Sequence, residues 1–174
     1  MRELVDASRL RRFMDALGRE ATVDGRIYFT GGATAVLFGW RASTIDVDLK
    51  LVPDDDRLLR HIPRLKETLS MNVELASPDQ FIPALPSWPD RSPFIERIGT
   101  VSFHHYDLYA QALAKIERGH THDLADVREM IARELIEPRR ALDFFATIEP
   151  ELYRFPAIDP PSFRRAAETV LARP

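Results

Sequence analysis

Two aspartates separated by a single residue carry the clearest chemical signal in the sequence. Asp46 and Asp48 fall in a segment, Thr44 to Val52, where apolar and polar residues alternate, and this pattern predicts a β-strand. Side chains two positions apart on a strand leave the same face, so both carboxylates are expected to point the same way. Paired carboxylates bind Mg²⁺, or Mn²⁺ in its place, and the phosphates of a nucleotide can complete the octahedral coordination.

A pair of glycines supplies a second part of the same expected site. Gly31 and Gly32 follow a predicted short strand at residues 26–30 and precede a predicted apolar helix at residues 33–40. Glycines allow the backbone to approach a phosphate closely, and the start of a helix offers amides without helical partners and the positive end of the dipole. The sequence therefore predicts that the glycine turn holds phosphate groups beside the two aspartates.

A third carboxylate follows in the next predicted strand, at residues 71–76. Glu74 can complete a site for two metal ions, in which one ion activates the attacking oxygen and the other steadies a pyrophosphate leaving group. Alternatively, Glu74 can help to deprotonate the acceptor. Each part also has an ordinary structural interpretation, because alternating aspartates often form a solvent-facing strand surface and Gly-Gly often forms a turn. The order of the parts along the chain favours a site.

This order resembles the nucleotidyltransferase superfamily. In that family a Gly-Gly or Gly-Ser turn and a helix precede an Asp-x-Asp or Asp-x-Glu pair set between apolar residues. The run Arg41-Ala42-Ser43-Thr44-Ile45-Asp46 looks like the AbiEii-type toxin relatives within the superfamily, and the resemblance covers residues 26–127. At the third carboxylate position the family more usually has Asp, where this chain has Glu74.

The resemblance implies a fold and a role for each part of the motif. The implied fold is an α/β (α+β) nucleotidyltransferase fold, in which a small mixed β-sheet is flanked by helices and followed by a helical C-terminal region. The implied metal ligands are Asp46, Asp48 and Glu74. The implied phosphate-binding residues are Gly31 and Gly32, together with Ser43 or Thr44.

A second stretch, at residues 112–127, is similar to the same relatives. Lys115, Arg118, Asp123 and Asp126 match their pattern, whereas His122 replaces an arginine. The resemblance implies that Lys115 contacts the nucleotide phosphates and that Asp123 is needed for activity. Carboxylates also suit the first turn of a helix whatever their function. That structural interpretation is favoured for Asp126, and both interpretations stay open for Asp123.

The histidines do not predict a metal site. His104 and His105 are adjacent on a predicted strand, so they point to opposite faces and do not easily bind one ion together. His120 and His122 lack the spacing of a helical ligand pair, and no cysteine is present to complete a site. One of His104 and His105 is instead expected to line the active-site cleft.

The composition limits the class of protein. The 174-residue chain is 45% hydrophobic and 29% charged and contains no Cys, which excludes collagen-like, disordered and disulfide-stapled classes, as well as zinc ribbons, iron–sulfur clusters and thiol catalysis. The net charge of −3 argues against a protein coated in nucleic acid. No apolar run approaches the roughly 20 residues of a spanning helix. The first residues also lack the apolar stretch of a signal peptide. We therefore expect no membrane association and a cytoplasmic location.

The remaining elements follow from periodicity and chain breakers. Helices are predicted at residues 7–19 and 54–69, and a hairpin at residues 94–103 that turns at Gly99. Five prolines between residues 77 and 93 predict a rigid irregular connection. The chain is predicted to be helical from Asp107 onward, with breaks at Gly119, Pro138, Pro150 and Pro156. We expect a nucleotidyltransferase core at residues 1–105 and a helical region at residues 106–174 packed on it as a single compact unit.

The expected function is Mg²⁺-dependent transfer of a nucleoside monophosphate from an NTP to a hydroxyl acceptor, with release of pyrophosphate. By resemblance to AbiEii-type toxins the acceptor is the 3′ end of tRNA, in a toxin–antitoxin context with a cognate antitoxin, and a protein acceptor is the second choice. In this scheme Lys115 offsets phosphate charge in the transition state. The rival hypothesis is a non-catalytic NTP-binding or partner-binding module on the same fold.

Overall fold

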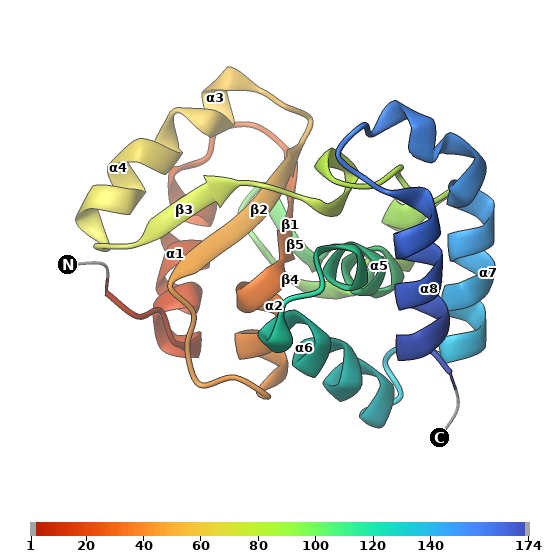
Figure 1. Cartoon of the computed structure of the whole chain (residues 1–174). Coiled ribbons are helices and arrows are strands. Elements are labelled where there is room, and N and C mark those ends of the chain that lie inside the picture. The colour runs from red at the N-terminus through yellow and green to blue at the C-terminus, as the bar shows by residue number, and fades with distance from the viewer. Residues whose placement is uncertain (1–2, 173–174) are drawn as a thin grey trace. The chain divides into compact units, whose positions relative to one another are not determined.

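A mixed five-stranded sheet organises residues 3–77 and 92–106 of the computed structural model, which describes residues 3–172 (Figure 1). The strand order is β3-β2-β1-β5-β4. β1 pairs antiparallel with β2 and parallel with β5, β2 pairs parallel with β3, and β4 pairs antiparallel with β5. The expectation of a small mixed sheet flanked by helices is therefore confirmed. The strands are β1 (Gly25–Thr30), β2 (Asp46–Val52), β3 (Asn72–Leu75), β4 (Phe94–Ile98) and β5 (Val101–His105).

The helices of this sheet unit differ from the prediction in one place. The helix expected at residues 54–69 is divided at Arg60 into two shorter helices. Pro63 gives the reason, because it has no amide hydrogen to donate to the carbonyl of Leu59, four residues earlier. The helix expected at residues 7–19 is confirmed. The helices of the sheet unit are α1 (Ala7–Glu20), α2 (Gly31–Phe38), α3 (Asp56–Leu59) and α4 (His61–Thr68).

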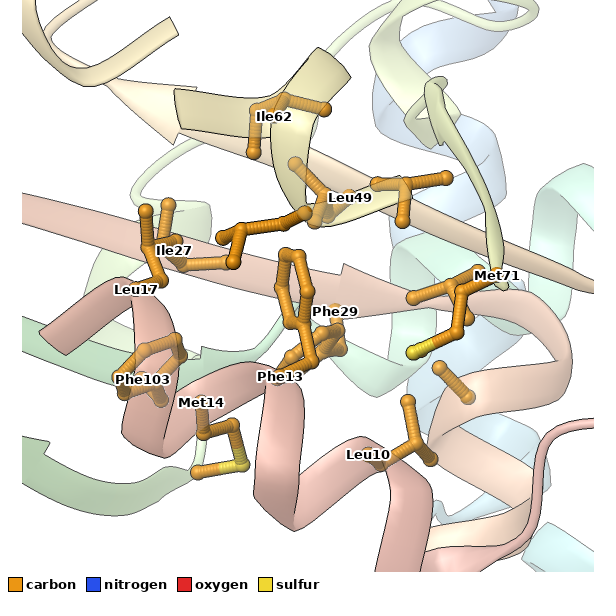
Figure 2. Close-up of a cluster of buried hydrophobic side chains, with 14 of the residues drawn as sticks. Leu10, Phe13, Met14, Leu17, Ile27, Phe29, Leu49, Ile62, Met71 and Phe103 are labelled. Carbon is orange, nitrogen blue, oxygen red and sulfur yellow. The ribbon is translucent and has the colours of Figure 1, made fainter. Parts of the chain in front are cut away.

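One face of the sheet forms the apolar core of the sheet unit (Figure 2). Burial alternates along β2, so that its apolar side chains enter the core while Asp46, Asp48 and Lys50 leave the other face. α1 buries an apolar stripe against the sheet, in which Phe13 meets Phe29 edge-on with ring centroids 6.3 Å apart. α3 and α4 add Leu58, Ile62 and Leu65 to the same cluster. The core therefore fixes which strand face presents the two aspartates.

The contact of α1 with the β4–β5 hairpin depends on Gly18. A Cβ atom at Gly18 would lie 2.8 Å from the carbonyl oxygen of Ile98 and would overlap the side chain of that residue. We therefore expect Gly18→Ala to lower the free energy of unfolding by about 1–3 kcal/mol through overpacking, although alanine is the better helix former. Urea unfolding checks this, with Ser8→Ala on the exposed face of α1 as the control. An unchanged or higher midpoint for Gly18→Ala would contradict the packing argument.

Residues 78–91 and 107–172 form a second, helical unit. The breaks expected near Gly119, Pro138 and Pro150 are found: Gly119 ends α5 in the left-handed conformation, Pro138 begins α7, and Pro150 lies in a 3₁₀ turn after α7. α7 and α8 pack through an edge-on pair, Phe145 and Phe163. The elements of this helical unit are η1 (Pro78–Gln80), η2 (Trp88–Arg91), α5 (Leu108–Arg118), α6 (Thr121–Ala132), α7 (Pro138–Ile148), η3 (Glu149–Arg154) and α8 (Pro160–Val170).

The division of the chain differs from the expected boundary near residue 105 in one respect. Residues 78–91, which we expected in the core at residues 1–105, belong with the helices instead. The cause is packing, since η1 lies against α5 and the apolar side chains of Ile82 and Leu85 are buried. Arg91 strengthens this association with two hydrogen bonds, of 2.7 and 3.1 Å, to the buried carboxylate of Asp107. Within residues 3–172, no helix has the length and apolar character needed to cross a membrane.

Candidate functional site

The glycine pair lies directly against one of the two aspartates. β1 ends at Thr30, opposite Asp48 in the antiparallel register, and α2 begins at the next residue. Gly31 has a φ of +60°, and a Cβ atom there would lie 3.1 Å from the Oδ2 atom of Asp48. Only glycine takes up this conformation without strain, and its lack of a side chain leaves the Asp48 carboxylate next to the helix end. The structure therefore brings the two motifs together.

The start of α2 differs from the prediction in a way that matters for the site. We expected the helix at residues 33–40, after the glycines, but it runs from Gly31 to Phe38 and ends at Gly39 in the left-handed conformation. The glycines therefore form the first turn of the helix, where an α-helix makes no internal hydrogen bond with its amides. Amides at this position, at the positive end of the helix dipole, favour an anion.

The Thr44 side chain packs against the second glycine, Gly32. A Cβ atom at Gly32 would overlap the hydroxyl of Thr44, so the threonine side chain packs directly on the glycine backbone. The Thr44 hydroxyl donates a hydrogen bond of 3.0 Å to the backbone carbonyl of Asp46, and the Thr44 amide bonds the carbonyl of Val5. Ser43 precedes it and is partly exposed. Thr44 thus connects the glycine turn to the start of β2.

The strand register places the three predicted carboxylates on one face of the sheet. In the parallel pair β2–β3, Asp46 lies opposite Asn72 and Asp48 lies opposite Glu74. Residues at these positions share a face because side chains alternate along each strand. Asp46 and Asp48 are partly exposed and Glu74 is exposed. Glu74 therefore lies directly opposite Asp48 on the neighbouring strand, and does not merely follow it in the sequence.

One residue of this face, Asn72, does not stand out in the sequence pattern. Asn72 donates hydrogen bonds from its amide nitrogen to the Oδ1 atom of Asp46, at 2.5 Å, and to the Oε1 atom of Glu74, at 2.9 Å. Its contact with Glu74 could have been found from the spacing of two residues on a predicted strand. Its contact with Asp46 depends on the register of β2 with β3, which the sequence does not reveal.

The donors of this face suit a cation held by two carboxylates. Within the part of the chain that the structure describes, no group of three or more His, Cys, Asp or Glu side chains is arranged to hold a metal ion. Asp46 and Asp48 supply oxygen donors on one face, and Gly31 leaves the space of a missing Cβ beside the second. Mg²⁺ prefers oxygen ligands and commonly takes one or two carboxylates, with phosphates and water completing the shell. The donor set therefore fits a divalent cation delivered with a nucleotide.

Lys115 and Asp123, the predicted residues of the helical unit, belong to a buried ionic cluster between α5 and α6. The Lys115 Nζ atom lies 2.7 Å from the Oδ2 atom of Asp126 and 3.7 Å from the Oδ1 atom of Asp123. Arg118 donates two hydrogen bonds to Asp123. Burial alone would raise the pKa of Asp123, but the Arg118 hydrogen bonds and the charges of Arg118 and Lys115 outweigh it and lower that pKa. Asp126 lies beyond the first turn of α6, so the expected helix-dipole role is wrong for this residue, and its structural partner is Lys115 instead.

The adjacent histidines make separate contacts within the sheet unit. His104 stacks on Tyr28, with ring centroids 5.1 Å apart, whereas His105 bonds the Thr34 hydroxyl at 3.0 Å and stacks on Phe38. They therefore occupy opposite faces of β5, as the strand alternation predicts. His120 and His122 lie in the helical unit with exposed side chains and stacked rings 5.8 Å apart.

The buried His105 side chain should make the folded protein less stable in acid. Burial lowers its pKa to about 4, since desolvation disfavours the charged imidazolium, and the charge of His104 adds to the effect. Between about pH 6.5 and 4 the unfolded chain takes up a proton that the folded chain does not, so this group should reduce the free energy of unfolding by about 3 kcal/mol as the pH falls. Urea unfolding at pH 7, 5.5 and 4 measures the slope.

His105→Gln is the informative variant for this acid dependence, and His122→Gln, at an exposed position, is its control. The first should unfold with a shallower dependence on pH than the wild type, and the second with the same dependence. Equal slopes for all three proteins would show that His105 is not the group responsible.

Comparison of the chain with protein-family models, with curated proteins and with solved structures finds no match in any of the three.

Proposed function

We propose that this protein is a Mg²⁺-dependent nucleotidyltransferase, with a nucleotidyltransferase fold, that transfers a nucleoside monophosphate from an NTP to a hydroxyl acceptor. One observation carries the proposal: the Asp48 carboxylate lies against Gly31 in the first turn of α2 while Asp46 leaves the same face of β2. Two carboxylates suited to a cation and a helix start that favours phosphate thus lie side by side. A triphosphate with its bound cation needs both.

The chain's own residues would act on the substrate in distinct ways. Asp46 and Asp48 would hold the cation, and the amides of Gly31 and Gly32 would donate to phosphate oxygens. The bound Mg²⁺ would supply charge neutralisation at the phosphates. The acceptor hydroxyl gives its proton to the Glu74 carboxylate or to water, and its oxygen bonds to the α-phosphorus. The bond from that phosphorus to the bridging oxygen of the β-phosphate breaks, so that pyrophosphate leaves with the electron pair.

The family resemblance supports a role in the reaction for two residues of the helical unit, Lys115 and Asp123. Lys115 would offset phosphate charge, and Asp123 would be needed for activity. The ion pairs that these residues make with Asp126 and Arg118 support an additional structural role for both. The same resemblance supports the 3′ end of tRNA as acceptor, with a protein acceptor as the second choice, and a cognate antitoxin as partner.

Labelled nucleotides test the proposal directly. Purified protein is incubated with each α-³²P-labelled NTP in turn, with Mg²⁺ and total tRNA, and the products are separated into RNA and protein fractions. Label in RNA or in protein from the wild type, absent from the Asp46→Asn/Asp48→Asn variant, would establish the transferase and its acceptor class. Asp54→Asn, an exposed aspartate just after β2, is the matched control and should transfer normally. No transfer with any NTP, with either acceptor, would refute the proposal.

A non-catalytic module that binds an NTP or a protein partner is the second candidate. It is favoured by the hydrogen bonds that Asn72 makes to Asp46 and Glu74, since these give each carboxylate a partner within the chain. The Asp48 carboxylate can likewise stabilise the start of α2, because it lies at the positive end of the helix dipole. An NTP-binding module would bind nucleotide without transferring it. A partner-binding module would keep its affinity for the partner in Asp46→Asn and Asp48→Asn. Nucleotide binding and partner binding are each readily measured.

A further inference from the structure

Asn72 lies among the carboxylates of the proposed site and contacts two of them at once. It begins β3 in direct register with Asp46, and its own strand carries Glu74 two residues further on. Its amide nitrogen lies 2.5 Å from the Oδ1 atom of Asp46 and 2.9 Å from the Oε1 atom of Glu74. A planar side-chain amide has two N–H hydrogens, one for each carboxylate. Asn72 is also the only asparagine in the chain.

The contact has an electrostatic reason. Three carboxylates occupy neighbouring register positions on β2 and β3, where adjacent strands are about 4.8 Å apart and residues on one face of a strand about 7 Å apart. Like charges at these separations repel one another. Hydrogen bonds to ionised carboxylates are strong, so the Asn72 amide holds the side chains of Asp46 and Glu74 on either side of it. It does so without adding a charge that would repel a cation.

We propose that Asn72 is a positioning residue that keeps Glu74 out of the cation site and leaves Asp46 and Asp48 as its carboxylate ligands. The inference rests on the proposed function. A cation shared by Asp46 and Glu74 would compete with the amide for the same two oxygens, Oδ1 and Oε1. Asn72 therefore takes the place of a cation shared by Asp46 and Glu74, and the pair that remains for the cation is Asp46 and Asp48, two residues apart on β2.

This arrangement selects between the two roles that the sequence left open for Glu74. Held by Asn72 beside the cation pair, Glu74 is a proton acceptor for the hydroxyl group that attacks the α-phosphorus, and not a ligand of a second cation. A general base of this kind contributes to turnover, whereas a ligand would contribute to cation affinity. The two roles are therefore separable by measuring cation binding and transfer independently.

Mn²⁺ binding provides the first test, because the electron paramagnetic resonance signal of free Mn²⁺ is lost on binding. In the wild-type background, Glu74→Gln should change the Mn²⁺ dissociation constant by no more than about twofold. With Asn72→Ala the carboxylate of Glu74 is released and can reach the cation. Asn72→Ala should then bind Mn²⁺ at least about fivefold more tightly than Asn72→Ala/Glu74→Gln, a coupling between neighbouring residues of ordinary size. Glu96→Gln, an exposed glutamate on β4, is the matched control.

Transfer kinetics provide the second test and separate positioning from general structural damage. Asn72→Ala should lower kcat by about tenfold or more while the KM for the NTP stays within about twofold, because it misplaces the base without removing a nucleotide contact. In the Glu74→Gln background the same substitution should have no further effect on kcat. Asn72→Val, with a good strand former, replaces Asn72→Ala if thermal unfolding shows that the alanine variant does not fold.

The outcomes separate this inference from the proposed function. Weakening of Mn²⁺ binding by about tenfold or more in Glu74→Gln would make Glu74 a ligand and overturn the inference, as would equal Mn²⁺ affinity of Asn72→Ala and Asn72→Ala/Glu74→Gln. Transfer by the wild type in either case would leave the proposed function standing. Unchanged Mn²⁺ binding by Asp46→Asn and Asp48→Asn would instead remove the cation site itself, and with it both proposals.

Discussion

Asp48→Asn is expected to reduce nucleotide transfer by about 10³-fold in kcat/KM, because a metal-binding carboxylate supports several kcal/mol of charge stabilisation in the transition state. The substitution keeps the size and the shape of the side chain, so the packing against Gly31 survives. The measurement is the initial rate of label transfer at saturating Mg²⁺. Asp54→Asn should retain the wild-type rate.

The stability of the Asp48→Asn variant provides a second measurement. Asp48 faces Glu74 across the β2–β3 register, and removal of one of these two like charges relieves their repulsion. Asp48→Asn should therefore unfold at the same or a higher urea concentration than the wild type, while its activity is lost. Residues kept for function commonly show this opposition between activity and stability. A variant that loses activity and stability together would instead indicate a structural role for Asp48.

The parts of the fold that the sequence predicts are those set by local pattern. The apolar stripe of α1 and the alternation in β2 are read directly from residue spacing, and the structure has both elements where the pattern places them. The start of α2 was missed because glycine is a poor helix former in a helix interior, whereas Gly31 and Gly32 occupy a first turn. The break between α3 and α4 was missed although Pro63 was available to predict it.

What the sequence does not reveal is which distant segments meet. Residues 78–91 belong with the helices because Ile82 and Leu85 are buried there and Arg91 bonds Asp107. The position of Asn72 opposite Asp46 follows from the register of two strands that are separated by α3 and α4. Neither pairing leaves a periodic signal in the sequence. The candidate site could therefore be predicted as a set of residue types, but its internal hydrogen bonds could not.

Lys115→Met should destabilise the protein by about 3–5 kcal/mol, the usual cost when one partner of a buried ion pair is removed. Lys115 is 6% exposed and Asp126 is 2% exposed, so the variant leaves a buried carboxylate without its ammonium partner. Asp123 keeps its two hydrogen bonds from Arg118 and should lose less. Urea unfolding measures the change, with Arg133→Met, in an exposed ion pair with Glu129, as the control that should cost about 1 kcal/mol or less.

The double variant Lys115→Met/Asp126→Leu then separates structure from chemistry at Lys115. Replacing both partners of a buried pair by apolar side chains removes the stranded charge, so the double variant should recover most of the lost stability. If Lys115 served only to neutralise Asp126, transfer activity would return with stability. If its ammonium group also offsets phosphate charge, the double variant stays folded and transfers nucleotide at least about 10²-fold more slowly than the wild type. Under the proposed function the latter result is expected, because an apolar pair restores the packing of α5 on α6 and supplies no positive charge.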